Sequence, residues 1–467
     1  MTTRPQTAAD LARAESVGFS PRFAIPILIG PALNPINTTM IAVALTPIAH
    51  AVGVSAATVI WLVAGLYLVS AVSQPAMGKL ADTFGPRRIY LFGLLIVAAA
   101  GVIPVLVPTF GGVLIARLLL GLGTSAAYPS AMTLISDQSA RLGRPAPQAL
   151  LSGLSISSLV TASIGPVLGG VLIHAFGWQS IFLVNIPLAL IALVLAVLWL
   201  PADRSRVRAP RTVSAWRAID PPGLALFAIT IVALLLFLLD LRSELFWLIP
   251  IAAGALIALI WWEYRARVPF IDVRMLVHNG PLARTYLRLM LVFTGSYLVV
   301  YAMSQWLQTD VGLAPSTAGL FQIPTAIVAG ICSVLVARAK RVRLPLIISA
   351  AASMVGGLLL TLLASDTPYF LILLALAIFG LPQGLASISN QAALYRQAPE
   401  GQIGVAAGLS RTSVQMGAIV ASSIIGIVFG QAPSDAGLNT IGWIVAALTG
   451  AALVLTILDR SLRAPKP

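Results

Sequence analysis

The sequence contains very little charge. Only 9% of its 467 residues are aspartate, glutamate, lysine or arginine, whereas soluble domains average about 25%. Apolar residues make up 58% of the chain, and the mean hydropathy is +0.96. So few charged side chains cannot cover the surface of a soluble protein of this length. The composition therefore excludes the soluble classes and indicates an all-α polytopic membrane protein.

Other features are missing as well. Cys332 is the only cysteine, so an intrachain disulfide is impossible and no redox compartment is implied. The polar segment from Met1 to Arg22 lacks the apolar core of a signal peptide, so we expect insertion to use the first span itself. No G-x-x-x-x-G-K-[ST] loop is present. ATP hydrolysis is therefore not supported, and we expect neither a cofactor nor a metal.

The basic residues are distributed in a way that gives the orientation. The net charge of +14 would fit a nucleic-acid binder, but the lysines and arginines lie in short loops instead of on one soluble face. Alternate loops hold nearly all of them, and the opposite loops hold only Arg242. Since lysine and arginine keep loops in the cytoplasm, both termini are predicted to be cytoplasmic.

Fourteen apolar segments have about the 20 residues that a transmembrane helix needs. Longer polar stretches at 201–219 and 264–283 bracket two of them, 220–240 and 245–263. The other spans are predicted at 22–49, 57–78, 88–108, 111–135, 149–174, 178–200, 284–307, 315–338, 343–364, 368–393, 403–430 and 437–458. The resulting boundaries are a tail at 1–21, a six-helix bundle at 22–200, linkers with two additional helices at 201–283, a second six-helix bundle at 284–458 and a tail at 459–467.

The loop between the second and third spans carries a specific motif. It reads Gly78-Lys-Leu-Ala-Asp82-Thr-Phe-Gly85-Pro-Arg87-Arg88. Solvation of a loop accounts for the arginines but not for an aspartate between two glycines. The pattern resembles the helix 2–helix 3 loop of the major facilitator superfamily, G-x-L-A-D-x-x-G-x-R-R. The resemblance implies two six-helix bundles, here with a two-helix insertion.

The resemblance also implies a role for the aspartate. In the family it braces the cytoplasmic ends of helices from the two halves and holds the outward-open state. A carboxylate at a helix N-terminus is a sound physical basis for such a latch. We therefore expect Asp82 to contact Arg87 or Arg88, Asp137, and the start of the span at 403–430, near Gln402.

A second motif lies in the span at 149–174. Gly165, Pro166, Gly169 and Gly170 resemble the family's antiporter motif G-P-x-x-G-G. Small residues at this spacing also form ordinary helix-packing faces in membranes. The segment 177–187, with its Trp178, is similar to the W-R-W-I-F-x-x-N-x-P of the fourteen-helix exporters. In combination the two segments favour the drug:proton antiporter branch.

Two intramembrane positions carry the expectations about coupling. Arg117 resembles the arginine of the family's R-x-x-Q-G-x-G motif, with Leu120 replacing the glutamine, and it either faces the bundle interior or snorkels to the outer surface. Asn37 stands where the antiporters typically carry a proton-binding aspartate. Asn34 and Asn37 could hydrogen-bond a substrate or Arg117 instead. The substrate or a co-transported anion would then supply the missing negative charge, so acidic or zwitterionic cargo would be favoured.

None of the fifteen acidic residues is central in a predicted span, so proton coupling is implied by the resemblance alone. Polar side chains in the middle of a span should face protein or a cavity. Interhelical hydrogen bonds explain many such residues, and in this superfamily others line a substrate cavity between the two bundles. The candidates of the second half are Tyr297, Tyr301, Gln305, Gln322, Gln383, Asn390, Arg411 and Gln415.

The resemblance favours a monomeric exporter of the plasma (inner) membrane. Its substrates would be drug-like or amphipathic small organic molecules, moved by alternating access and driven by protons, with no nucleic-acid partner. Two alternatives remain open. One is a solute or peptide symporter or uniporter of the same fold, although the peptide transporters' E-x-x-E-R signature is absent. The other is a membrane sensor that no longer transports.

Overall fold

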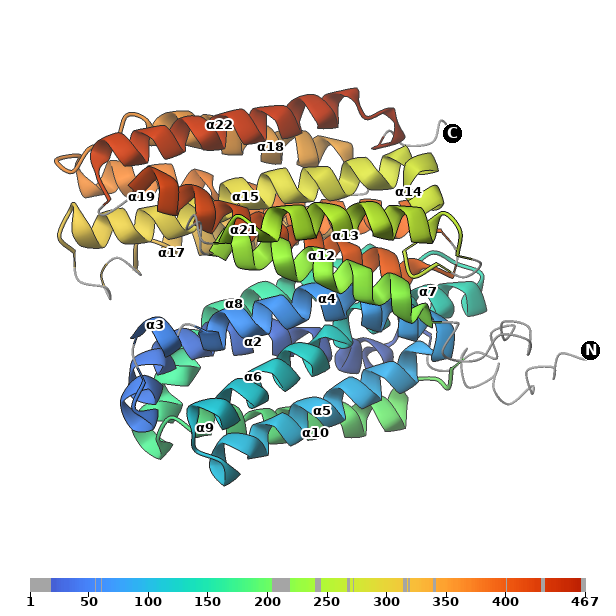
Figure 1. Cartoon of the computed structure of the whole chain (residues 1–467). Helices are drawn as coiled ribbons and strands as arrows, with labels where there is room; N and C mark the ends of the chain where they lie inside the picture. The colour runs from blue at the N-terminus through green and yellow to red at the C-terminus, as the bar shows by residue number, and fades with distance from the viewer. Residues whose placement is uncertain are drawn as a thin grey trace, which may run out of the picture. The chain divides into compact units, whose positions relative to one another are not determined.

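The computed structural model describes residues 18–54, 56–59, 61–203, 219–239, 245–266, 269–271, 273–313, 317, 320–338, 342–399, 401–429 and 433–462. Every regular element within these ranges is a helix (Figure 1). The predicted all-α class is therefore confirmed.

The first half holds nine helices among the described residues. They are α2 (Pro21–Val52), α3 (Ala56–Val59), α4 (Trp61–Phe84), α5 (Pro86–Leu106), α6 (Phe110–Ser125), α7 (Ala127–Leu142), α8 (Gln148–Phe176), α9 (Ser180–Leu183) and α10 (Asn185–Trp199).

The later helices follow the segment 204–218, which lies outside the described residues. They are α12 (Pro221–Leu239), α13 (Leu248–Glu263), α14 (Val273–His278), α15 (Gly280–Thr309), α17 (Ile323–Arg338), α18 (Arg343–Leu360), α19 (Tyr369–Ile378), α20 (Gly380–Gln397), α21 (Ile403–Phe429) and α22 (Asp435–Leu458). Ten candidate spans among the described residues are long and apolar enough to cross a bilayer, and shorter apolar helices lie over the remaining predicted spans. The count of fourteen and the cytoplasmic termini stay predictions.

Three predicted spans are interrupted by a single non-helical residue. The interruptions fall at Ala126, Val184 and Phe379, each three residues before a proline. Proline lacks an N–H and its ring crowds the carbonyl four residues earlier, so the helix tightens or breaks in that turn. The prolines are Pro129, Pro187 and Pro382. Proline alone does not decide the outcome, because α4 continues through Pro75.

The chain divides into two compact units. The first comprises Met1–Ile231, Leu256–Val273 and Ala398–Thr412, and the second comprises Val232–Ala255, Arg274–Gln397 and Ser413–Pro467. This division differs from the boundaries predicted from sequence. The start of α21 belongs to the first unit, and the hairpin of α12 and α13 is divided between both units.

Within each unit the helices pack in a repeated order. In the first, α5 packs on α10, and in the second, α18 packs on α22. An equivalent hydrogen bond joins the helix ends in each pair. Arg87 donates from Nη2 to the carbonyl of Val197, and Arg343 donates from Nη2 to the carbonyl of Ile457, each at 2.7 Å. The two halves are therefore structural repeats, a relation that is only faint in the sequence.

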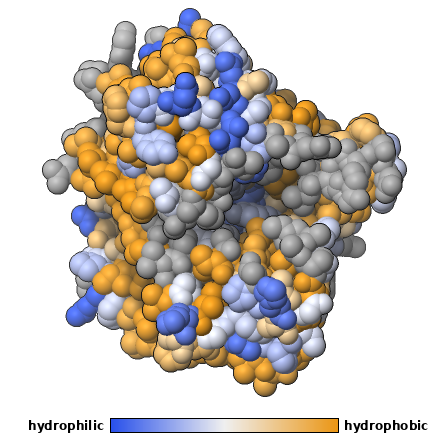
Figure 2. All heavy atoms as spheres, turned by 90° about the vertical axis from the view of Figure 1, so that its left-hand side faces the viewer, coloured by the Kyte–Doolittle hydropathy of each residue, from blue (hydrophilic) through white to orange (hydrophobic). Residues whose placement is uncertain are grey.

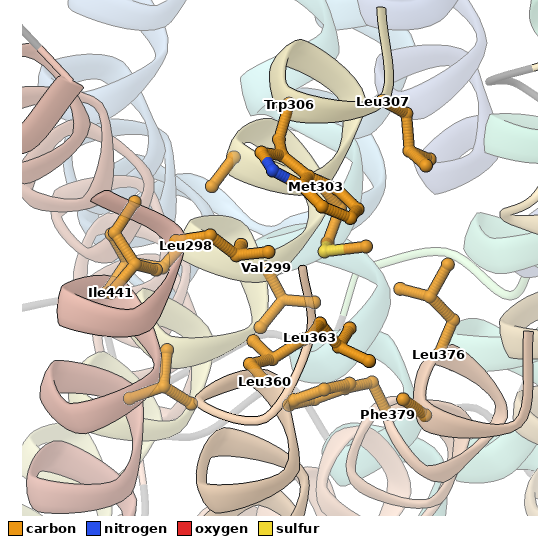
Figure 3. Packing of buried hydrophobic residues seen from close by; sticks show 14 of the residues in the cluster. Leu298, Val299, Met303, Trp306, Leu307, Leu360, Leu363, Leu376, Phe379 and Ile441 are labelled. Atoms are coloured by element: carbon orange, nitrogen blue, oxygen red, sulfur yellow. The ribbon is translucent and has the colours of Figure 1, made fainter. Parts of the chain in front are cut away.

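The second unit has a large apolar core. Figure 3 shows side chains of α15, α18 and α22 converging there, together with Leu376 and Phe379. Trp306 is fully buried in this cluster, and its Nε1 donates to Asp310 at 3.1 Å and to Asp435 at 2.8 Å. The aromatic ring is thus buried without leaving its N–H unpaired.

Large apolar side chains are also exposed, as expected for helices that face lipid. Val171, Ile257 and Leu374 are more than half exposed. On the face seen in Figure 2, apolar residues occupy broad areas and hydrophilic residues gather in smaller groups.

Candidate functional site

Asp82 lies near the end of α4 and binds the start of α21. Its Oδ1 accepts hydrogen bonds from the backbone N–H of Gly404 at 3.1 Å and from the hydroxyl of Thr133 at 3.0 Å. Its Oδ2 accepts from the N–H of Val405 at 3.0 Å. The first N–H groups of a helix lack partners inside the helix and carry the positive end of its dipole, so a carboxylate stabilises them. The contact predicted between Asp82 and the start of this helix is present.

Glycines bring α4 and α21 together at this point. A Cβ added to Gly78 would collide with the backbone of Gly404, and one added to Gly408 would collide with the backbone of Gln74 and Pro75. The hydroxyl of Thr412 then donates to the carbonyl of Ala71 at 2.9 Å. The spacing Gly404-x-x-x-Gly408 is a familiar signal for close helix packing, so these residues could have been found in the sequence.

Arg87 and Arg88 bind a different carboxylate from the predicted one. The N–H of Arg87 donates to Asp203 Oδ1 at 2.7 Å, and the N–H of Arg88 donates to Oδ2 at 3.2 Å. Gly85 has φ +108°, and a Cβ there would strike Asp203. The turn aims the amides of both arginines at Asp203, beyond the end of α10, and their contact with Asp82 stays a prediction.

The electrostatics of Asp203 follow from its partial burial in this loop. Burial raises the pKa of the Asp203 carboxyl above its usual range, and the hydrogen bonds from the backbone of Arg87 and Arg88 oppose that rise. Asp137, the other predicted member, lies one turn along α7 from Thr133, whose hydroxyl binds Asp82.

Asn37, at the position of the expected aspartate, forms a closed amide pair. Its Nδ2 donates to Asn185 Oδ1 at 2.6 Å, and Asn185 Nδ2 donates to Asn37 Oδ1 at 3.0 Å. Asn37 is 2% exposed and Asn185 is fully buried. The pair joins α2 to α10 through two neutral groups, neither of which takes up or releases a proton near neutral pH. Asn185 is the asparagine of the motif around Trp178, and sequence reasoning did not select it as a site residue.

Arg117 is buried and bound to backbone carbonyls. Its Nε donates to Leu62 at 2.9 Å and its Nη1 to the main-chain carbonyl of Asn37 at 3.0 Å. With only 2% exposed, it does not snorkel. The side-chain carbonyls of Asn34 and Asn37, which could have accepted from Arg117, do not do so, because its hydrogen bonds go to these backbone carbonyls. Asn34 Nδ2 donates to Thr124 Oγ1 at 2.9 Å.

The antiporter motif packs α8 against α2. A Cβ on Gly165 would strike the side chain of Thr39, and one on Gly169 would lie 2.9 Å from Val43. Gly170 faces open space. The side chain of Pro166 lies outside the described ones. Two of the three motif glycines are therefore required by helix packing.

Arg411 is a half-buried cation on the part of α21 that belongs to the first unit. Its guanidinium lies 3.9 Å from the centroid of the Tyr128 ring, a cation–π contact. No carboxylate among the described residues forms an ion pair with it. It lies seven residues beyond Gly404, roughly 10 Å along α21 at 1.5 Å per residue. Tyr128 was not predicted from the sequence.

The other predicted polar residues belong to the second unit. Tyr297 and Tyr301 stack with ring centroids 5.6 Å apart. Asn390 Oδ1 accepts from Arg288 Nε at 2.8 Å, and Arg284 and Arg288 reach Asp459 at 3.0 and 3.7 Å. Asn390 therefore belongs to a buried ion cluster that sequence reasoning missed. Gln305 is exposed, Gln322 and Gln383 are half-buried, and Gln415 is buried with its Oε1 unpaired.

Among the described residues, no group of three or more histidine, cysteine, aspartate or glutamate side chains could hold a metal ion.

Comparisons with known proteins agree with this arrangement. Residues 27–276 and 285–467 match the model of the Major Facilitator Superfamily. The chain is 32% identical to the uncharacterised MFS-type transporter YwoD of Bacillus subtilis, over 93% of this chain and 96% of that protein. It is 28% identical to the multidrug efflux pump LfrA of Mycolicibacterium smegmatis, over 92% and 82% of the two chains. The solved structure of the proton:xylose symporter XylE shares the fold, with a TM-score of 0.64 at 14% identity over 94% and 95% of the chains.

Proposed function

The chain belongs to the Major Facilitator Superfamily, and we propose that it is a proton-driven exporter of drug-like or amphipathic organic molecules. Membership of a transporter family and the multi-pass fold are the premise. The export direction and the drug:proton antiporter branch are supported by the similarity to LfrA and by the packing of Gly165 and Gly169. We place it in the plasma membrane as a monomer with fourteen spans and both termini in the cytoplasm.

The observation that carries the proposal is the contact between Asp82 and the start of α21. Three hydrogen bonds hold a single carboxylate on the N–H groups of Gly404 and Val405 and on Thr133. The start of α21 belongs to the first unit, whereas its remainder belongs to the second. A bond at this place can be made in one state and broken in another, which is what alternating access requires.

The substrate class is proposed from Arg411. An intramembrane arginine without an anionic partner is costly, by about 2.5–3.5 kcal/mol on insertion scales. Arg117 meets part of this cost through two backbone carbonyls, and its burial removes it from a substrate's reach. Arg411 is half-buried and lies against the Tyr128 ring, and no carboxylate among the described residues forms an ion pair with it. We therefore propose that Arg411, and not Arg117, binds the negatively charged group of the substrate. Acidic or zwitterionic cargo should then be favoured.

Transport in proteoliposomes tests the function. An imposed pH gradient, acidic on the side into which substrate is exported, should accelerate export of an amphipathic dye several-fold over equal pH, and a protonophore should remove the difference. Transport that is insensitive to the gradient would contradict proton coupling. A complete absence of substrate-dependent flux would contradict the exporter proposal itself.

A further inference from the structure

The base of the α12–α13 hairpin contains two buried carboxyl groups. Asp220 precedes α12, and its Oδ1 accepts from the N–H of Gly223 at 3.3 Å and from Trp262 Nε1 at 2.8 Å. Its Oδ2 accepts from the N–H of Phe270 at 3.0 Å. Asp220 is 5% exposed, and its φ of +55° is the only positive value at a non-glycine residue among the described residues. Both oxygen atoms of this carboxylate therefore accept hydrogen bonds.

Only one of the two carboxyl oxygens of Glu263 has a hydrogen-bond partner. It is 1% exposed, and its Oε1 accepts from the N–H of Ile271 at 3.1 Å. Its Oε2 is buried without a hydrogen-bond partner. A Cβ on Gly223 would collide with Asp220 Oδ2 and would lie 2.7 Å from Glu263 Oε1, so the two carboxyl groups face each other across this glycine. An unpaired buried oxygen in such a place is the position of a missing proton or ligand.

Charges of both signs act on Glu263. Among the described residues, the charged groups that act on Glu263 are Asp220 and Lys79. The Lys79 ammonium donates to the carbonyl of Pro269 at 2.6 Å, beside the amides that bind the two carboxylates. Two carboxyl groups that share a dry site do not both ionise readily, because each negative charge opposes the other and burial opposes both.

We propose that the base of this hairpin is a proton-binding site, in which Glu263 holds the proton on Oε2 with the carboxylate of Asp220 beside it. Release of this proton leaves two negative charges beside Lys79 and draws its ammonium away from Pro269. Lys79 is three residues from Asp82 on α4. The site thus connects proton binding at the base of the extra hairpin to the signature loop. The site stands on its own geometry, and only its effect on transport rests on the proposed function.

The pH dependence of thermal unfolding tests the site without any transport measurement. In the native state Glu263 binds a proton that the unfolded chain has released, so stability should fall as the pH rises from about 4.5 to about 7 and should level off above that. For a chain of 467 residues, one proton of difference corresponds to a decline of about 1.4 °C per pH unit. Glu263→Gln, whose amide keeps the shape, should lose this component. The exposed Asp366→Asn should keep the wild-type slope and is the matched control.

Other groups also contribute to the pH dependence, so the readout is the difference between variant and wild type. An unchanged slope in Glu263→Gln would overturn the proposal. Asp220→Asn is the second variant, and it should move the decline to lower pH because Glu263 loses the negative neighbour that opposes its ionisation. Infrared difference spectra provide a measurement that does not need either variant to fold. Wild-type protein should show the C=O band of a buried protonated carboxyl at neutral pH that disappears on alkaline titration, and absence of this band would also overturn the proposal.

Discussion

At the scale of single residues, one carboxylate performs several tasks. Asp82 satisfies two N–H groups at the start of α21 and one hydroxyl on α7. The backbone N–H groups of the two arginines in the same motif donate to Asp203 instead. The motif therefore holds two separate carboxylate sites within one short turn, and only the first involves α21.

Asp82→Asn tests the contact with α21 without changing the Asp203 site. The amide can accept one N–H, but its own NH₂ then faces the second N–H, and the attraction of a full charge to the helix N-terminus is lost. We expect transport in proteoliposomes to fall roughly tenfold, corresponding to about 1.4 kcal/mol. Expression and membrane insertion should stay near wild type, as should transport by Asp366→Asn. Wild-type rates in Asp82→Asn would remove the latch from the mechanism.

At the scale of helices, glycines decide which elements approach closely. Gly78 and Gly404 lie backbone to backbone, whereas Gly426, on the same helix as Gly404, has no neighbour within 4 Å of an added Cβ. The first part of α21 is thus fitted to α4, and the later glycine has room for a side chain.

Gly404→Ala and Gly426→Ala form a matched pair of tests. In Gly404→Ala the new methyl group strikes the backbone of Gly78 and approaches Asp82, so the Asp82 hydrogen bonds should lengthen. We expect this variant to lose most of its transport. Gly426→Ala should be active, with a slightly raised melting temperature, because alanine is favoured over glycine in a helix by about 1 kcal/mol. Equal loss in both variants would show that α21 tolerates no added methyl group, and that the contact with Gly78 is not special.

The ion cluster of the second unit sets another test at this scale. Asp459 caps α22 and is 1% exposed. Burial raises the pKa of its carboxyl, but hydrogen bonds from Arg284 and Ser461 outweigh burial, and the pKa lies below its usual value. A lowered native pKa contributes stability that is present above the unfolded value and is lost as the pH falls through the native one.

Asp459→Asn leaves the buried Arg288 without its anion, a change that typically costs about 3–5 kcal/mol. We expect a clearly lower melting temperature at pH 7. The variant should also lose less stability than wild type on acidification to about pH 3, because the titrating group is gone. Melting curves of wild type and variant that decline in parallel on acidification would contradict this assignment.

At the scale of the whole molecule, patterns along the chain predicted the helices and the family. Each predicted span coincides with a helix or a pair of helices, since apolar length is a local property. Pairings between distant residues were not predictable. The bond from Arg87 to Asp203 joins positions 116 apart, and the pair Asn37–Asn185 joins positions 148 apart. Composition does not specify such partners. The three helix breaks had a signal in their prolines, but Pro75 shows that the signal is ambiguous.

The charge of the cargo is a property of the whole transporter, and two arginines give different expectations for it. Arg117 is sealed by carbonyls of Leu62 and Asn37, so Arg117→Ala should chiefly destabilise the first unit. Arg411 offers a half-buried guanidinium beside the Tyr128 ring. Arg411→Gln removes the charge and keeps hydrogen-bonding capacity. Wild type should export an anionic dye faster than a cationic dye of matched size and hydrophobicity.

That preference should disappear in Arg411→Gln, through a fall of roughly tenfold for the anion, as expected when a charge-assisted contact is lost. In Arg117→Ala both dyes should fall in parallel, because fewer molecules are folded. Initial export rates per folded transporter separate the two cases. If wild type and Arg411→Gln both export the two dyes equally, the transporter has no preference for anions. The contact between the Arg411 guanidinium and the Tyr128 ring would then be structural only. If the preference for the anionic dye is lost in Arg117→Ala and kept in Arg411→Gln, Arg117 is the residue that binds the anion. Its hydrogen bonds to the two backbone carbonyls would then have to open during the transport cycle.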